Sequence, residues 1–286
     1  MLGLGLLADE IDRKRPPSEL KKQLYRRKGW LWGGMPDWSN PHAIVVEARR
    51  DIGQAGVVRA FSAFDLFMDE IAADLARWIA FSKQEPSSTE DENDEPDRAA
   101  RFYRSIGGTP AAVGFLWPVY RYFRFARDCI VHRDGIASKA LEETYRDPDL
   151  TAALADWVKR TGEMTAPEII PVEAGCLIDL NHRQAISASS VLRLIALDIN
   201  GQALQLLGVP GLVYLAAHKI FFDDEPIVDV TGYGSMLKAL NWILAGRYRV
   251  RAFKDGATAR VLRDLKLTKD CSARFLEIKR TAQAQT

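Results

Sequence analysis

The residue types best suited to chemistry lie in residues 127–135, which read RDCIVHRDG. Histidine has an unperturbed pKa of about 6.5, so His132 can move a proton near neutral pH. Arginine can hold a phosphate through two parallel hydrogen bonds, so Arg127 can stabilise charge on a phosphate. Asp128 can accept a hydrogen bond from one ring nitrogen of His132 and fix its tautomer. This set fits attack of an RNA 2′-hydroxyl on the adjacent phosphate, a reaction that DNA cannot undergo.

These side chains must be positioned by a helix that the sequence predicts from near Pro118 to about His132. Its buried stripe is expected to consist of the apolar residues Tyr122, Phe125, Ala126, Cys129 and Ile130. The pair Asp134 and Gly135 is typical of a helix end, because glycine readily adopts the left-handed conformation that terminates a helix.

Helical geometry places Arg124, Asp128 and His132 along one face, because they are four residues apart. Arg127 is five residues from His132 and therefore lies about 140° away around the same helix. Within one ideal helix the two side chains do not face each other. They can converge if the helix end loosens at Gly135, or if two copies of the helix pack together.

Other arginines on or beside this helix are candidates for holding an RNA strand, and they are Arg121, Arg124 and Arg133. A purely structural alternative stays open, since an arginine five residues before a histidine often arises by chance. In that alternative Arg127 pairs with an acidic side chain. His132 then caps the helix C-terminus, where a cation interacts favourably with the helix dipole.

The same stretch resembles the signature of the HEPN superfamily, the higher eukaryote and prokaryote nucleotide-binding domains. That signature is an arginine, a polar residue that is often asparagine, a short spacer and a histidine, and many members read much like Arg-Asn-x-x-Val-His-x-x-Gly. The matching residues are Arg127, Asp128, Val131, His132 and Gly135. The resemblance extends over about residues 40–208, where the predicted helix order is similar to the four- to five-helix HEPN bundle.

The resemblance implies a metal-independent endoribonuclease that acts as a homodimer and needs no cofactor. In such enzymes the motif helices of two protomers meet and both motifs line one cleft, which would bring arginine and histidine together. Carried over to this chain, Arg127 and His132 are the catalytic candidates and Asp128 is the orienting residue. Members commonly serve as toxins or in antiviral defence and have RNA as substrate, and an antitoxin or other partner protein is then expected. Other HEPN domains are catalytically inactive and only bind nucleotides or partners.

The composition places this chain among ordinary intracellular proteins. It has 286 residues, is 47% hydrophobic and 27% charged, and carries a net charge of +1. Its three cysteines are too few and too scattered for a disulfide framework or a zinc site, which suits a reducing cytoplasm. No apolar run approaches the ~20 residues of a membrane helix. We therefore expect a cytoplasmic protein with no membrane partner and no metal site.

The chain is expected to have a basic N-terminal arm, a helical domain and a basic C-terminal module, over residues 1–39, 40–208 and 209–286. The domain should contain a long helix ending near Ser82, whose first half Gly53 and Gly56 interrupt. Residues 84–97 hold seven acidic residues and two prolines, and are expected to be a disordered insertion. Helices over 99–106, 138–146, 149–160 and 184–207 and a short strand or extended segment over 176–180 complete the domain. The predicted fold is thus mainly α, with an up-and-down helical bundle.

The C-terminal module is the second functional candidate, because residues 247–280 carry eleven basic and four acidic residues. Residues 247–253 alternate like a strand with three arginines on one face, namely Arg247, Arg249 and Arg251. They are candidates for RNA binding. A DNA-binding regulator that uses residues 247–280 is an alternative function for the whole chain. A basic surface that is merely solvated is a further alternative.

Overall fold

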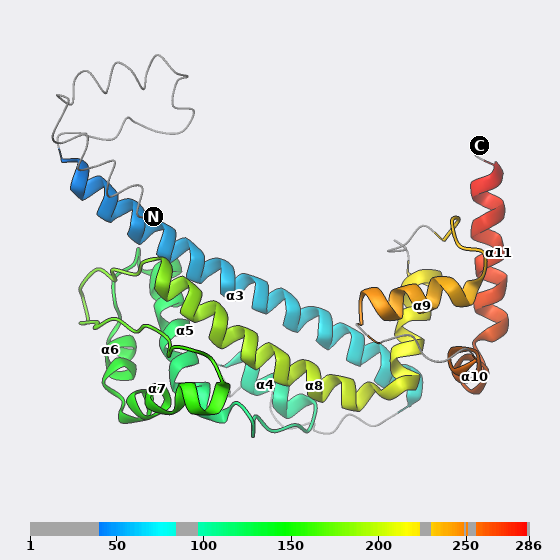
Figure 1. Cartoon of the computed structure of the whole chain (residues 1–286), viewed down its shortest axis with the longest axis horizontal. Coiled ribbons are helices and arrows are strands. Elements are labelled where there is room, and N and C mark those ends of the chain that lie inside the picture. The colour runs from blue at the N-terminus through cyan, green and yellow to red at the C-terminus, as the bar shows by residue number, and fades with distance from the viewer. Residues whose placement is uncertain (1–39, 84–96, 224–229, 249, 251–255, 285–286) are drawn as a thin grey trace, which may run out of the picture. The chain divides into compact units, whose positions relative to one another are not determined.

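The computed structural model describes residues 40–83, 97–223, 230–248, 250 and 256–284 (Figure 1). The fold is mainly helical, as predicted, and no strand occurs within these ranges. The elements in chain order are α3 (Pro41–Ser82), α4 (Arg98–Ser105), the short 3-10 helix η1 (Gly114–Leu116), α5 (Trp117–His132), α6 (Lys139–Arg146), α7 (Pro148–Thr161), α8 (His182–Phe221), α9 (Met236–Gly246), α10 (Ala257–Asp264) and α11 (Thr268–Ala284).

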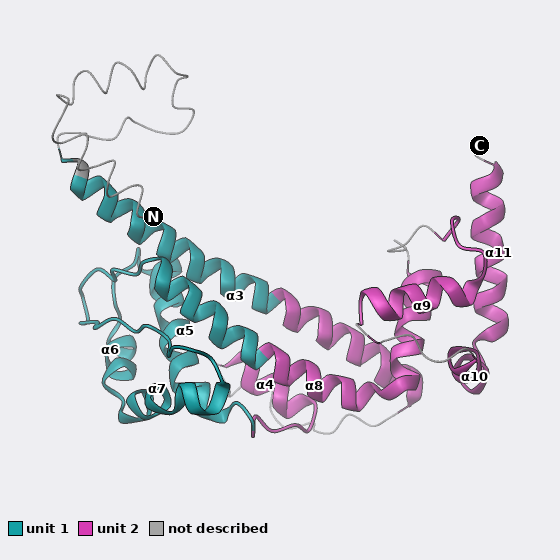
Figure 2. Ribbon diagram, in the orientation of Figure 1, with its two compact units in different colours: residues 1–65, 112–195 teal, residues 66–111, 196–286 magenta. Residues whose placement is uncertain are grey.

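The residues form two compact units, which Figure 2 shows in different colours. The described part of unit 1 consists of residues 40–65 and 112–195. That of unit 2 consists of residues 66–83, 97–111, 196–223, 230–248, 250 and 256–284. This division cuts across the predicted ranges 40–208 and 209–286, because α3 and α8 each contribute one segment to each unit. The predicted arm, residues 1–39, lies outside the described residues.

Unit 1 is built around the buried face of α5. Tyr122, Phe123 and Ala126 on this helix are almost completely buried. The ring of Phe61 on α3 packs against that of Tyr120 in a tilted arrangement, with ring centroids 5.9 Å apart. Trp157 of α7 is also 1% exposed. Burying side chains of this size stabilises the fold by about 1.5–3 kcal/mol each.

The prediction that Gly53 and Gly56 interrupt α3 is wrong, because the helix is continuous from Pro41 to Ser82. Both glycines instead mark places where α3 meets the start of α8. A Cβ at Gly53 would lie 2.4 Å from the main-chain oxygen of Leu180, and one at Gly56 would lie 2.6 Å from Cβ of Ala185. The absence of side chains at these positions is therefore a packing requirement.

Unit 2 contains the second segments of α3 and α8 together with α4 and α9–α11. Gly208 interrupts α8 with φ 54° and ψ −170°, close to the predicted end of a helix at this glycine. Phe81 stacks on Tyr214 with ring centroids 4.2 Å apart.

Asp97, which we predicted to belong to a disordered insertion, is buried and caps α4 by accepting hydrogen bonds from the main-chain amides of Ala99 and Ala100. Residues 84–96 of that insertion lie outside the described residues.

Candidate active site

Helix α5 carries the predicted motif and remains regular through His132. It begins at Trp117 with Pro118 in its first turn, where a proline is tolerated because the first amides have no intrahelical partner. It ends at His132 with Arg133 as its C-cap, after which Asp134 and Gly135 adopt φ values of 52° and 78°. The predicted helix end is therefore confirmed, and the helix does not loosen before His132.

The turn after α5 is fixed by main-chain hydrogen bonds to residues 175–178. The amide of Ile178 donates to the oxygen of Gly135 at 2.9 Å, and the amide of Ala137 donates to the oxygen of Cys176 at 2.9 Å. Only one isolated bridge forms here, between Ile136 and Leu177, so of the two predicted possibilities for residues 176–180 the strand is wrong and the segment is non-helical with a single bridge. These bonds hold the C-terminal end of the motif helix in one position.

Gln54 of α3 supports the same turn from a second side. Its side-chain amide donates to the oxygen of Ile178 at 3.1 Å, and a Cβ at Gly135 would lie 2.9 Å from the Nε2 atom of Gln54. Gly135 is therefore required both for its positive φ and for the close approach of Gln54.

Arg127 and Asp128 form the one close contact among the predicted catalytic residues within the described chain. Nη1 of Arg127 donates to Oδ1 of Asp128 at 2.8 Å, and the two side chains are 29% and 42% exposed. Asp128 therefore accepts a hydrogen bond from Arg127, whereas the sequence suggested His132 as its partner. Nε of Arg127 is buried and has no hydrogen-bond partner among the described residues.

The side chain of His132 lies exposed on the last turn of α5 and forms no hydrogen bond or ion pair with any described residue. Because the helix is regular here, Arg127 and His132 remain about 140° apart around the axis. A single chain does not bring the two side chains together on this helix.

The other predicted RNA-binding arginines differ in their environments. Arg121 and Arg133 are exposed, and the guanidinium of Arg124 lies 4.8 Å from the ring centroid of Phe125. Arg247 donates to Oε2 of Glu70 at 3.1 Å, so its charge is compensated within the protein. Arg249 and Arg251 lie outside the described residues.

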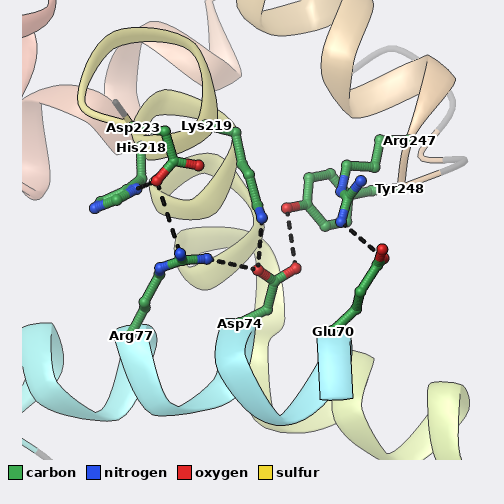
Figure 3. Close-up of polar contacts among 8 residues, drawn as sticks. All are labelled: Glu70, Asp74, Arg77, His218, Lys219, Asp223, Arg247 and Tyr248. Atoms are coloured by element: carbon green, nitrogen blue, oxygen red, sulfur yellow. Dashed lines mark hydrogen bonds and ion pairs between the residues drawn. The ribbon is translucent and has the colours of Figure 1, made fainter. Parts of the chain in front are cut away.

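The sequence reasoning missed a network of charged side chains in unit 2, which Figure 3 shows. Its centre is Asp74 of α3, which is 7% exposed. Nη1 of Arg77 and Nζ of Lys219 each lie 3.4 Å from Oδ1 of Asp74, and the hydroxyl of Tyr248 donates to Oδ2 at 3.5 Å. Burial raises the pKa of Tyr248, and the carboxylate of Asp74 raises it further.

A second carboxylate, Asp223, extends this network beyond the end of α8. Nη2 of Arg77 lies 3.7 Å from Oδ1 of Asp223, and Nδ1 of His218 lies 3.1 Å from the same oxygen. The network thus joins α3, the end of α8 and the residues after α9. One signal in the sequence pointed to it, because Asp74 lies three residues after Ile71 and four before Trp78, within the apolar stripe of α3.

Within the described ranges, no group of three His, Cys, Asp or Glu side chains is placed to hold a metal ion. By length and composition α8 is apolar enough to cross a membrane, but half of its most apolar stretch is buried, as in the core helix of a globular protein. This helix therefore does not indicate a membrane span.

The fold and the candidate site define a mainly helical protein with an arginine–aspartate pair and an exposed histidine on one helix. Comparisons with protein-family models, with curated proteins and with solved structures found no match.

Proposed function

We propose that this protein is a metal-independent endoribonuclease of the HEPN type, with a helical bundle of that type in residues 40–208. The observation that carries the proposal is the placement of Arg127 and His132 on one regular helix, followed by a fixed turn at Gly135. His132 is solvent-accessible and Arg127 is partly exposed, as residues that meet a polymeric substrate must be. The setting is a toxin or antiviral defence system in the cytoplasm, with a partner protein that restrains the activity.

The proposed reaction is transphosphorylation within RNA. The 2′-oxygen forms a bond to the adjacent phosphorus while the bond from phosphorus to the 5′-oxygen breaks, which leaves a 2′,3′-cyclic phosphate and a free 5′-hydroxyl. His132 takes the proton from the 2′-hydroxyl or gives one to the leaving 5′-oxygen. Arg127 stabilises the negative charge on the phosphate oxygens.

A homodimer is part of this proposal, because one regular helix keeps Arg127 and His132 on different faces. Two copies of α5 that meet would place an arginine of one protomer beside a histidine of the other. The buried Nε of Arg127 is compatible with this, because it has no hydrogen-bond partner among the described residues and an RNA phosphate or a second chain would supply one. Arg121, Arg124 and Arg133 would then hold flanking phosphates.

The test is a cleavage assay with labelled total RNA in excess EDTA, in which the product ends are checked for 2′,3′-cyclic phosphate. We expect wild-type protein to cleave, and the Arg127→Ala and His132→Ala variants to lose at least ~100-fold in rate, the range for a general acid–base residue. The matched controls are His42→Ala, an exposed histidine on α3, and Arg146→Ala, an exposed arginine that pairs with its neighbour Glu142.

A mixture of the two inactive variants tests the shared cleft. We expect part of the activity to return, because a mixed dimer contains one intact arginine and one intact histidine. Folded, dimeric wild-type protein that leaves all RNA intact would contradict the proposal and favour an inactive HEPN module that binds a nucleotide or partner.

A further inference from the structure

The end of the chain contains a helix-turn-helix arrangement that the proposed ribonuclease site does not use. Helix α10 ends at Asp264 and α11 begins at Thr268, so three residues join them. The turn is fixed by Lys266, whose φ is 60°, and by a hydrogen bond of 2.9 Å from the amide of Leu267 to the oxygen of Leu262. Figure 1 shows α10 beside the start of α11, which runs away from it in a different direction, as in helix pairs joined by a turn of this length.

A small core keeps these two helices and α9 together. Leu262 of α10 and Cys271 of α11 are fully buried, and Phe275 is 7% exposed. Thr258 donates from its hydroxyl to Oδ1 of Asn241 on α9 at 2.8 Å. The three helices therefore form a packed platform on which the outer face of α11 has a fixed position.

The outer faces of α10 and α11 are strongly basic. Residues 256–284 contain seven basic and three acidic residues. Five of these cations are exposed and form no ion pair with a described residue, namely Arg260, Arg263, Lys266, Lys269 and Arg280. The other two are engaged, because Arg274 donates to the oxygen of Phe221 and to Glu277, and Lys279 lies 5.3 Å from the ring centroid of Phe275.

Three exposed residues of α11 share one face by helical spacing, and the exposed acids Asp270 and Glu277 lie to one side of that face. Lys269, Leu276 and Arg280 are seven and four residues apart, opposite the buried Cys271 and Phe275. Leu276 is 51% exposed although it is apolar. A cation at each end of the face with an apolar residue between them is suited to phosphates on both sides of a groove and to a thymine methyl group within it.

We propose that α10 and α11 bind double-stranded DNA, with α11 in the major groove and the cations of α10 and of the turn on the phosphates. The major groove of B-form DNA is about 12 Å wide and admits a helix, whereas that of A-form RNA is too narrow and deep. This function goes beyond RNA cleavage. The proposed DNA-binding range is residues 256–284 in place of the predicted 247–280, and it leaves out Arg247, which is paired with Glu70.

The test is fluorescence anisotropy of a labelled 30-base-pair DNA with the full-length protein at several salt concentrations. The comparison ligand is an RNA duplex of the same sequence with 2′-O-methyl groups, which the proposed ribonuclease cannot cleave. We expect the DNA to bind at least tenfold more tightly than the RNA. The double variant Lys269→Ala/Arg280→Ala should lose at least tenfold in DNA affinity. The slope of log affinity against log salt concentration should also become shallower, by the amount expected for the loss of about two phosphate contacts.

The matched control is Lys139→Ala/Arg146→Ala, which removes two exposed cations from α6 in unit 1. We expect it to change DNA affinity less than twofold, and circular dichroism should show that both double variants keep the helical content of the wild type. No binding of DNA by the wild type, equal binding of the RNA duplex, or an equal loss in the control would each overturn the proposal. RNA cleavage is measured separately and is expected to be unaffected by Lys269→Ala/Arg280→Ala.

Discussion

Gln54 on α3 donates a hydrogen bond to the main-chain oxygen of Ile178, 124 residues later in the chain, and lies against Gly135 as it does so. This contact fixes the end of the motif helix from outside that helix. The fixed end matters because His132 lies only three residues before Gly135.

The Gly135→Ala variant should therefore be destabilised by two separate effects. The φ of 78° is strained for alanine, and the new Cβ would lie 2.9 Å from Nε2 of Gln54 and displace its hydrogen bond. We expect a loss of about 2 kcal/mol in the free energy of unfolding in urea, from backbone strain and a broken, partly buried hydrogen bond.

Gly175→Ala is the control for strain alone. Gly175 has a similar φ of 85°, but a Cβ there would meet no atom within 4 Å. The Gly175→Ala variant should lose only about 1 kcal/mol in the free energy of unfolding. Equal losses in the two variants would show that Gln54 contributes nothing to the turn.

Neutralising Asp128 tests how its pairing with Arg127 affects the proposed ribonuclease. Asp128→Asn keeps a side-chain oxygen but removes the charge that competes with phosphate for the guanidinium. A partly exposed ion pair contributes up to about 1 kcal/mol, so we expect KM for RNA to fall by at most about fivefold while kcat stays unchanged. Steady-state cleavage kinetics measure both constants. A kcat that falls more than tenfold would instead show that the charge of Asp128 takes part in the reaction.

Asp74 is expected to be the most sensitive acidic residue in unit 2. Asp74→Asn removes the counter-ion of Lys219, whose side chain is only 13% exposed, whereas Arg77 keeps its contact with Asp223. Breaking such a buried pair costs about 3 kcal/mol in the free energy of unfolding. Chemical denaturation followed by circular dichroism measures the loss.

Asp69→Asn is the matched control, because Asp69 pairs with Arg98 on the same unit but is 63% exposed. An exposed ion pair contributes at most about 1 kcal/mol. Equal losses in the free energy of unfolding for Asp74→Asn and Asp69→Asn would show that burial of Asp74 does not strengthen its ion pairs.

Stability should fall at alkaline pH because of buried tyrosines. Burial raises the pKa of Tyr103, and its hydrogen bond of 2.6 Å to Asp198 raises it further. Above the ordinary value of 10.0 the unfolded chain loses this proton and the folded chain keeps it, so the free energy of unfolding decreases as pH rises. Urea titrations between pH 8 and pH 11 measure the slope. Tyr103→Phe should flatten the slope, and an unchanged slope would contradict this assignment.

The features that could be predicted from the sequence are those that depend on residues close together along the chain. The bounds of α5 and its capping turn at Gly135 follow from helical spacing and from local end signals. The assignment of Arg127 and His132 as catalytic residues rests on one short motif and stays a prediction. The role of Gly53 was missed because its contact, the oxygen of Leu180, lies far along the chain. Asp74 was missed for the same reason, since Lys219 and Tyr248 reach it only in the folded chain.

The division of α3 and α8 between the two units has a consequence for synthesis on the ribosome. The second half of α3, with the buried residues Met68 and Trp78, emerges long before Tyr214 and the other residues of α8 that cover it. Unit 1 can close once residue 195 has emerged, but unit 2 must wait for the last helices. A chain whose translation stops early therefore exposes an apolar helix face, which is the kind of surface that chaperones and proteases recognise.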